Sequence, residues 1–353
     1  MIISTLKVYN FRSYHLYETP LSSTGTIIVG PNGTGKTNLL EAVYIALRGH
    51  SFRGSLADCM RHQQPQSVIH LETDQAHRRL QLQRSAEGTL TKEFTINDSR
   101  AKILPRKHRV PVVLFEPNEL QVLSSSPGRR RDFLDSLLGR LDPHYETTLR
   151  SFQRTLLQRN ELLKHPQPSS HIWREHLFAW DIKFVQLARQ VAQARALFLD
   201  TQTTALRQLY HSLAGHHSAL AMSYLPSVSL AHYEQSLLDR LQQTRSDELH
   251  SGFTSVGPQR EDFLILLHDQ PATKVASRGE MRTIMLAFKL LELELQTARA
   301  ATRPLILMDD VFSELDARRE QLLQEAIQQH QFILTTTDTR HRRDNCLVIS
   351  TTA

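Results

Sequence analysis

"GPNGTGKT" (residues 30–37) is the stretch of sequence from which the fold of this chain is predicted. It matches the P-loop pattern G-x-x-x-x-G-K-[S/T], and it lies between a β-branched run, "GTIIVG", and a helical run, "NLLEAVYIAL". Its three glycines let the backbone curl so that N–H groups face phosphates, and Lys36 adds a positive charge for the outer phosphates. The Thr37 hydroxyl is expected to be a ligand of Mg²⁺. The predicted phosphate-binding residues are Gly30, Pro31, Asn32, Gly33, Thr34, Gly35, Lys36, Thr37 and Asn38.

An acidic strand accompanies the P-loop. "PLILMDD" (residues 304–310) is an apolar run that ends in two carboxylates. Asp309 is expected to hold the Mg²⁺ shell together with Thr37, and Asp310 to orient or deprotonate an attacking water. The predicted catalytic residues are Lys36, Asp309 and Asp310, and the predicted cofactors are ATP and Mg²⁺.

A second anion-binding feature is the segment "ASRGEMRT" (residues 276–283), which opens a helical run over residues 280–300. Ser277 and Gly279 at such a start present backbone N–H groups and a partial positive charge to an anion, although an ordinary helix cap has the same residues. A helix start about thirty residues before an acidic strand is the pattern of ATP-binding-cassette (ABC) ATPases. There, this helix in one subunit closes over the ATP held by another. We therefore expect Ser277 and Gly279 to contact the γ-phosphate bound by a second copy, in an ATP-dependent homodimer.

The composition favours an intracellular protein with an anionic partner. The chain has 353 residues, 40% of them hydrophobic, a formal charge of +6 and two cysteines, Cys59 and Cys346. A basic balance favours nucleic acid, and two cysteines make no disulfide framework. The N-terminus has no signal-peptide pattern, and no apolar run is long enough to span a membrane. We expect a cytoplasmic, nucleoid-associated protein with no membrane partner.

The periodicity of the sequence predicts an interrupted α/β unit. Residues 2–11 and 110–115 have the composition of strands, whereas from about residue 130 the apolar side chains follow helical spacing. Prolines near residue 167 separate two helical arms without a sustained heptad pattern, which excludes a long coiled coil. Strands and helices alternate again after residue 250. The expected fold is therefore an α/β, ABC-type P-loop ATPase head with a helical insertion and short arms. The expected ATPase domain comprises residues 1–115 and 251–353, and the insertion residues 116–250.

Taken together, these motifs resemble a known family. "LKVYNFRSY", "GPNGTGKTNLLEA", "HSFRG", "VVLFEPNEL", "SPGRRRDFLD", "GPQRED", "SRGEMRT" and "LILMDDVFSELD" are similar, in this order, to the motifs of the bacterial RecF recombination mediators. That family is an SMC-like branch of the ABC ATPases without long coiled coils. The resemblance implies an ATP-dependent dimer that binds double- and single-stranded DNA at gaps and junctions. It also implies cooperation with RecO and RecR to load RecA in DNA repair, replication and the SOS response, with weak DNA-stimulated ATP hydrolysis.

The resemblance assigns roles to individual residues. Lys36 and Thr37 match the P-loop pair, Ser277 the signature serine, and Asp309 with Asp310 the acidic pair. Arg12 matches an arginine near the end of the first strand, which in SMC-like relatives reaches the nucleotide phosphates; a surface position for Arg12 is the alternative.

The chain also departs from the usual ABC pattern. Asp310 stands where most ABC ATPases have Glu, and the shorter side chain predicts slow turnover. Arg278 and Glu280 flank the signature glycine, Thr337 stands where a switch histidine is usual, and Gln259 replaces a histidine common in the family.

Two basic clusters are the predicted DNA-binding surface. Residues 100–131 carry eight Lys or Arg against two Glu. Such side chains bind phosphates without reading sequence, and no helix-turn-helix, zinc-finger or RNP pattern accompanies them, so recognition of DNA shape is expected. Solvated surface charges are the alternative for each residue. The predicted DNA contacts are Arg106, Lys107, Arg109, Arg129, Arg130 and Arg131.

Other functions remain open at this stage. An ABC transporter's nucleotide-binding subunit and a P-loop small-molecule kinase share the P-loop, and a DNA clamp that binds ATP without hydrolysing it shares the basic clusters. DNA-stimulated hydrolysis, phosphorylation of an added metabolite and single-turnover hydrolysis would distinguish them.

Overall fold

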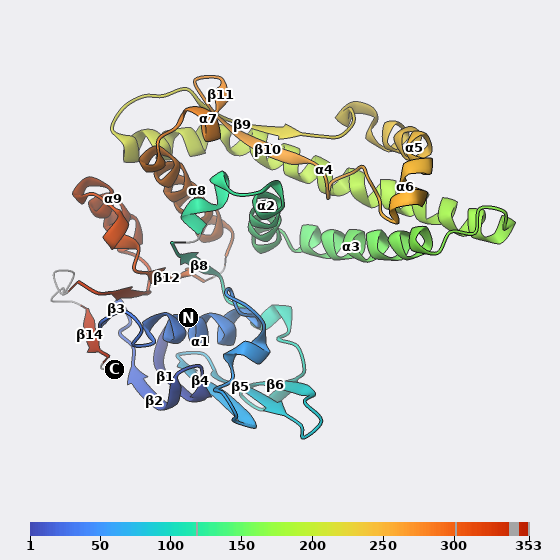
Figure 1. The fold of residues 1–353 in the computed structure, drawn as a ribbon. Helices are drawn as coiled ribbons and strands as arrows, with labels where there is room; N and C mark the ends of the chain where they lie inside the picture. Colours follow the sequence, from blue (N-terminus) through green and yellow to red (C-terminus); the bar gives the residue numbers. More distant parts are fainter. Residues whose placement is uncertain (118, 301, 339–345, 352–353) are drawn as a thin grey trace. The chain divides into compact units, whose positions relative to one another are not determined.

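The computed structural model describes residues 1–117, 119–300, 302–338 and 346–351 (Figure 1). The chain divides into two compact units. Unit 1 consists of Met1–Glu119 with Glu292–Ala353, and unit 2 of Leu120–Leu291. The mixed α/β class expected from the sequence is confirmed, and both ends of the chain contribute to unit 1. Among the described helices, none has both the length and the apolar character needed to cross a bilayer.

A five-stranded parallel sheet carries the P-loop in unit 1. Its order is β14-β3-β13-β12-β8, with every neighbouring pair parallel. The strands are made mainly of β-branched and apolar residues; four of them are buried, as parallel strands covered on both faces require, whereas the edge strand β14 is only half-buried. Their bounds are β3 (Gly25–Val29), β8 (Val112–Phe115), β12 (Leu305–Asp309), β13 (Phe332–Thr336) and β14 (Leu347–Ser350).

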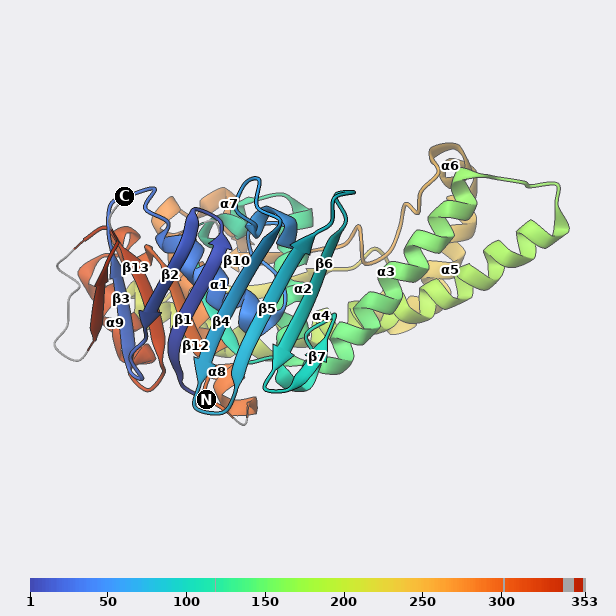
Figure 2. The same cartoon turned by 90° about the horizontal axis from the view of Figure 1, so that it is seen from below.

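A second, six-stranded antiparallel sheet completes unit 1. Its order is β2-β1-β4-β5-β6-β7, and Figure 2 views its strands face-on. Buried and exposed residues alternate along its strands, which is typical of a sheet with one face on a core and the other in water. The strands are β1 (Ile3–Phe11), β2 (Tyr14–Pro20), β4 (Gln66–Thr73), β5 (His77–Arg84), β6 (Leu90–Ile96) and β7 (Ser99–Ala101).

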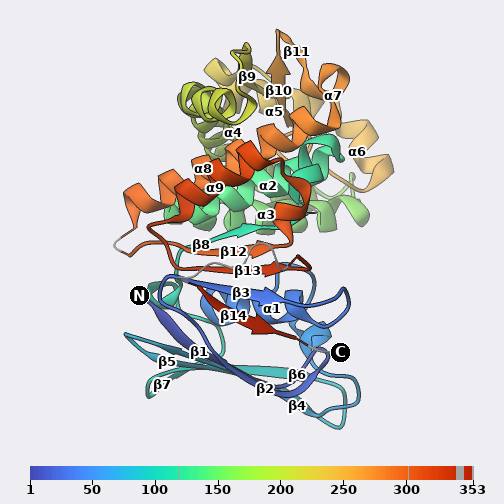
Figure 3. The ribbon, with the colours of Figure 1, turned by 90° about the vertical axis from the view of Figure 1, so that its left-hand side faces the viewer.

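Helix α1 (Lys36–Arg48), which follows the P-loop, lies between the two sheets (Figure 3). Its residues from Leu39 to Leu47 are almost completely buried, and the apolar ones among them belong to one hydrophobic cluster with side chains of both sheets. A helix packed on opposite faces cannot tilt without opening that cluster. The core therefore fixes the direction in which the start of α1 points. The remaining elements of unit 1 are η1 (Leu56–Cys59), η2 (Arg106–His108), η5 (Val311–Glu314) and α9 (Ala317–Ile327).

Unit 2 is mainly helical. Helices α3 (Pro143–Lys164) and α4 (His171–Ala214) run side by side as its arm (Figure 1). Its sheet has three antiparallel strands in the order β11-β10-β9. Helix α8 (Arg278–Arg299) begins in unit 2 and ends in unit 1. The remaining elements are η3 (Glu119–Ser124), α2 (Pro127–Leu141), β9 (Leu220–Leu225), η4 (Leu230–His232), α5 (Tyr233–Gln243), α6 (Arg245–Ser251), β10 (Asp262–Leu267), β11 (Gln270–Pro271) and α7 (Ala272–Val275).

The units differ from the expected domains in two segments, of which the first, residues 116–119 in unit 1, is short. The sequence pattern groups residues 251–353 with the ATPase domain, whereas residues 251–291 are compact with unit 2. The physical reason is β9, which the sequence analysis does not predict as a strand. It pairs with β10 over six residues, from Leu220↔Leu267 to Leu225↔Asp262, and holds β10 in unit 2.

A buried network of ion pairs joins three helices of unit 2. Arg159 of α3 donates to Asp181 of α4 at 2.8 Å and to Glu248 of α6 at 2.6 Å, and all three side chains are 0% exposed. Arg245 also donates to Asp181, at 2.5 Å, and the Thr254 hydroxyl accepts a bond from Arg159 at 2.6 Å. Each buried charge therefore has a partner of opposite sign, which is the condition under which such charges are tolerated.

Candidate nucleotide-binding site

The P-loop lies between the carboxyl end of β3 and the start of α1. The loop is tied to the neighbouring strand, because Gly30 N donates to Thr336 O at 3.2 Å. Lys36 is 7% exposed, and its Nζ donates to the carbonyls of Gly30 at 2.7 Å and Pro31 at 2.8 Å. The ammonium group is thus held beside the loop that would bind a phosphate.

The glycines of the loop meet two different needs. Gly33 and Gly35 have left-handed backbones, with φ values of 84° and 93°, which side chains other than glycine rarely adopt. A Cβ on Gly35 would also lie 2.8 Å from both Ser13 Oγ and Tyr14 Oη, whereas one on Gly33 would meet no described atom within 4 Å. Gly35 therefore allows the turn between β1 and β2 to approach the loop, and Gly33 leaves the face of the loop open.

The hydroxyl of Thr37 contacts the carboxylate of Asp309. Thr37 Oγ1 lies 2.8 Å from Asp309 Oδ1 and 2.9 Å from Oδ2, although the two residues are 272 positions apart. Thr335 of β13 also donates to Asp309 Oδ1, at 2.7 Å. The parallel sheet produces this meeting, since β3, β13 and β12 are consecutive neighbours and their carboxyl ends share one edge.

Asp310 has a strained backbone and an incompletely bonded carboxylate. Its φ is 49° and its ψ 29°, in the left-handed region, and its N–H donates to Thr335 O at 3.0 Å. Its Oδ1 is buried and has no hydrogen-bond partner in the described part of the chain. An oxygen of this kind is an available acceptor for a water proton, and backbone strain of this kind clusters at active sites.

These residues fit a Mg²⁺-nucleotide. Mg²⁺ takes oxygen ligands and commonly has only one or two from protein, the rest coming from phosphates and water. Thr37 Oγ1 and the Asp309 carboxylate supply such a pair, and the open face at Gly33 with the buried ammonium of Lys36 suits the phosphates.

Three further predicted residues lie in or near the loop, and one of them, Arg12, forms an ion pair. Arg12 donates to both carboxylate oxygens of Glu41, at 2.8 and 2.7 Å, and to Asp58 O at 2.7 Å. The hydrogen bond to Glu41 raises the pKa of Arg12. Asn38 Nδ2 donates to Ser13 Oγ at 3.0 Å, and Asn32 is exposed. Arg12 is thus anchored to α1, five residues after Lys36.

Glu41 is a residue that the sequence analysis misses. It is 0% exposed and accepts hydrogen bonds from Arg12, from Ser51 Oγ at 2.5 Å and from the thiol of Cys59 at 3.7 Å. Burial raises the pKa of Cys59 to about 12, so the thiol stays protonated and donates. A single acidic residue within the apolar run "NLLEAVYIAL" is the signal that could have identified Glu41, because a carboxylate is buried only with partners.

Ser277 and Gly279 lie in unit 2 and open α8. Ser277 N donates to the Glu280 carboxylate at 2.8 Å, and Glu280 N donates to Ser277 Oγ at 3.2 Å, which is a capping box. The bonds from Ser277 lower the pKa of Glu280. Ser277 therefore caps α8 in this structure, and it is the same serine that is expected to contact a phosphate.

The predicted DNA-binding residues differ in exposure. Arg106 and Lys107 of unit 1 are exposed, as is Arg129 of unit 2, whereas Arg109 is half-buried. Arg130 forms an ion pair with Asp262 and donates to Ser125 O, and Arg131 donates to Glu261 O at 2.9 Å. These bonds hold α2 against the start of β10. They direct two of the three guanidinium groups of "RRR" to the interior of unit 2.

Comparison with known proteins identifies the family. Residues 2–352 match the family model described as the RecF/RecN/SMC N-terminal domain. A Streptomyces avermitilis protein, called DNA replication and repair protein RecF, is 35% identical over 355 residues, covering 95% of this chain and 93% of the relative. The chain belongs to the RecF family. Another RecF relative, from Gloeobacter violaceus, is 32% identical, with 96% of this chain and 92% of the relative covered.

The fold of RecF proteins is shared along the chain. A solved structure described as the recombination mediator protein RecF-ATP in the RecFOR pathway is 25% identical and covers 99% of this chain and 95% of its own, with a TM-score of 0.85. The resemblance to RecF and the expected ATPase-head fold without a long coiled coil are therefore confirmed.

Proposed function

We propose that this chain is an ATP-dependent, DNA-binding recombination mediator. Its ATP-induced homodimer binds double- and single-stranded DNA at gaps and junctions. With RecO and RecR it promotes RecA loading in DNA repair and replication restart, in the cytoplasm at the nucleoid. The observation that carries the proposal is the contact of Thr37 with Asp309 beneath the glycine-rich loop of a RecF-family chain. Relatives named for DNA replication and repair, and a RecF structure with ATP, support it.

The site residues divide the work of hydrolysis. Lys36 Nζ, freed from the two loop carbonyls, would donate to the outer phosphates, and Thr37 with Asp309 would hold Mg²⁺. Bound Mg²⁺ neutralises phosphate charge. Asp310 Oδ1 would accept a proton from the attacking water. Because this carboxylate is one methylene shorter than the usual glutamate, we propose a weak ATPase that DNA stimulates, with hydrolysis as the switch that ends dimerisation.

The dimer requires the start of α8. The Ser277 hydroxyl and the N–H groups near Gly279 would contact the γ-phosphate held by a second copy. Glu280 competes for this place, because its carboxylate already accepts the Ser277 N–H. We therefore propose that the γ-phosphate displaces the Glu280 side chain when the dimer forms.

The exposed members of the basic clusters are the proposed DNA contacts. Three of them are exposed, namely Arg106, Lys107 and Arg129. An exposed cationic side chain is sufficient for a contact with a backbone phosphate. Arg130 and Arg131 would instead hold α2 in place so that Arg129 is presented. DNA affinity should then fall steeply between low and moderate salt, because bound cations release counterions from DNA.

Sedimentation tests the proposal directly. The full chain is expected to dimerise with ATP, to stay monomeric with ADP, and to bind gapped DNA best in the ATP state. Ser277→Arg should keep nucleotide binding but abolish the ATP-driven dimer, whereas Ser251→Arg, at an exposed serine of the same unit, should dimerise normally. A Ser277→Arg protein that dimerises as the wild type does would contradict the shared site.

A further inference from the structure

The end of strand β14 packs against the P-loop. Strand β14 pairs in parallel with β3, with Ser350 opposite Val29, and the next residue, Thr351, donates its N–H to Val29 O at 2.9 Å. Thr351 is 6% exposed and lies 317 positions from Thr34 in the sequence, yet the hydroxyl oxygens of the two threonines are 2.9 Å apart. The phosphate-binding loop is therefore in contact with a segment to which the sequence analysis assigns no role.

The approach of Thr351 explains why residue 30 is a glycine. A Cβ on Gly30 would lie 2.3 Å from Thr351 Oγ1 and 2.7 Å from Thr351 O. Contacts this short are not tolerated in a packed interior, and the second of them is to a backbone atom that cannot rotate away. Gly30, unlike Gly33 and Gly35, does not have a positive φ. The close contact with Thr351 is therefore what excludes a side chain at this position.

The two hydroxyl groups form a short chain of hydrogen bonds that ends on a carbonyl of the loop. Thr34 Oγ1 donates to Pro31 O at 3.0 Å. Because a hydroxyl has a single proton, Thr34 Oγ1 accepts at its contact with Thr351 Oγ1, and Thr351 is the donor there. Lys36 Nζ donates to the same Pro31 carbonyl at 2.8 Å. Pro31 O is thus held by the Thr34 hydroxyl and by the ammonium group that the phosphates would require.

This second donor matters when the ammonium group moves to a phosphate. A P-loop binds phosphates through its backbone N–H groups, so a carbonyl that turned toward the phosphates would repel them. Once Lys36 Nζ donates to a phosphate, the bond from Thr34 to Pro31 O still holds that carbonyl in place. The Thr351 hydroxyl determines the direction of this bond, because it fixes the rotation of the Thr34 side chain.

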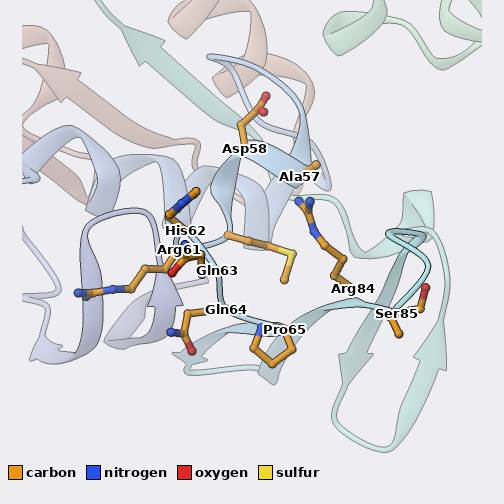
Figure 4. Close-up of a pocket in the computed structure, with 11 residues that line it drawn as sticks. Ala57, Asp58, Arg61, His62, Gln63, Gln64, Pro65, Arg84 and Ser85 are labelled. Atoms are coloured by element: carbon orange, nitrogen blue, oxygen red, sulfur yellow. The ribbon is translucent and has the colours of Figure 1, made fainter.

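The backbone of Thr34 is held separately from its side chain. Tyr14 Oη, in the turn between β1 and β2, donates to Thr34 O at 3.2 Å. The same turn is fixed by Arg61, whose side chain points away from the open cavity shown in Figure 4, and whose Nη1 donates to Ser13 O at 2.9 Å. Loss of the Thr351 hydroxyl should therefore release the Thr34 side chain while the backbone of residue 34 stays in place.

We propose that Thr351 is a positioning residue of the nucleotide site. Its hydroxyl orders the Thr34 side chain, which keeps the Pro31 carbonyl turned away from the bound phosphates. The inference rests on the proposed binding of ATP at the P-loop and adds to it a requirement for the end of β14. Because the loop holds the phosphates both before and during hydrolysis, the contact should lower KM for ATP and leave kcat unchanged.

Nucleotide binding by Thr351→Val provides the test. Titration calorimetry of the full chain with ADP and Mg²⁺ measures binding by the single copy, because ADP lacks the γ-phosphate proposed to join two copies. Valine replaces the hydroxyl with a methyl group, and the affinity for ADP should fall about two- to tenfold, as for loss of one hydrogen bond. KM for ATP should rise by the same factor with kcat unchanged. Thr351→Ser keeps the hydroxyl and should bind ADP as the wild type does.

Two further variants separate this role from a loss of stability. Thr73→Val removes a half-buried hydroxyl that donates to Ala76 O at 2.8 Å in the turn between β4 and β5, and it should leave ADP affinity unchanged. Thr34→Val should weaken ADP binding at least as much as Thr351→Val does. Adding Thr351→Val to Thr34→Val should cause no further loss, because both substitutions act through Pro31 O.

The outcomes distinguish this proposal from the proposed function. If the wild type binds ADP and Thr351→Val binds it as tightly as Thr73→Val does, the proposal is wrong and the nucleotide site stands. Losses that multiply in the double variant would contradict action through Thr34. If Thr351→Val does not fold, Thr34→Val decides: weakened ADP binding supports the proposal, and wild-type affinity overturns it. If the wild type binds neither ATP nor ADP, the proposed function falls together with this inference.

Discussion

Replacing Asp310 with glycine should make the protein more stable and nearly inactive. The left-handed backbone at φ 49° costs a residue other than glycine about 1–2 kcal/mol, of which the greater freedom of unfolded glycine offsets about 0.5–1 kcal/mol. Removing a buried carboxylate oxygen that has no partner returns about 1–3 kcal/mol. The expected gain in the free energy of unfolding is therefore about 1–4 kcal/mol. Hydrolysis should fall about 10²–10⁴-fold, as for loss of a general base.

The matched control for this prediction is Asp310→Asn. Asparagine has the same left-handed backbone cost as aspartate and keeps a buried side-chain oxygen, so this variant should lose activity but gain little stability. Urea unfolding without nucleotide measures stability, and single-turnover hydrolysis measures the chemical step. An Asp310→Gly protein that unfolds at the same urea concentration as Asp310→Asn would refute the strain argument. One that hydrolyses ATP at the wild-type rate would refute the catalytic role.

Three other perturbations have defined outcomes. Lys36→Arg should lower the hydrolysis rate at least about 10²-fold, measured as phosphate release, because a planar guanidinium cannot occupy the place of the ammonium between two loop carbonyls. Burial lowers the pKa of His330, so its neutral form stabilises the fold; the free energy of unfolding should fall as the pH drops below about 6.5, and His330→Gln should flatten that dependence. Arg159→Met should lower the free energy of unfolding by about 3–5 kcal/mol, since it leaves two buried carboxylates without their shared partner. Lys164→Met, at an exposed ion pair, should change it by at most about 1 kcal/mol in the same urea titration.

The contact between Thr37 and Asp309 follows from the sequence because each of the two motifs is local. Residues 25–37 contain a strand followed by the glycines, lysine and threonine of the loop, and "LMDD" ends a strand whose type is evident from its apolar residues. The rule that parallel strands share an edge then brings Thr37 and Asp309 together without further information. The polar end of β13, which contributes Thr335, follows from the same rule.

Features that depend on a distant partner could not be predicted in this way. "PGRRRDFLD" shows three arginines, but only the fold shows that Asp262 faces Arg130, 132 residues later. The same holds for β9, whose weak alternation becomes a strand by pairing with β10. For Arg12 the sequence allowed phosphate or solvent, and the observed partner is Glu41.

The buried ion pairs of the arm fix the alignment of its helices. Arg159 of α3 pairs with Asp181 of α4 and with Glu248 of α6. Sliding α3 by a single helical turn, about 5.4 Å, would separate these groups and leave charges facing apolar side chains. Because α3 cannot slide along α4 by small amounts, a force applied at the tip of the arm would move the arm as a rigid body and would be transmitted to the rest of unit 2.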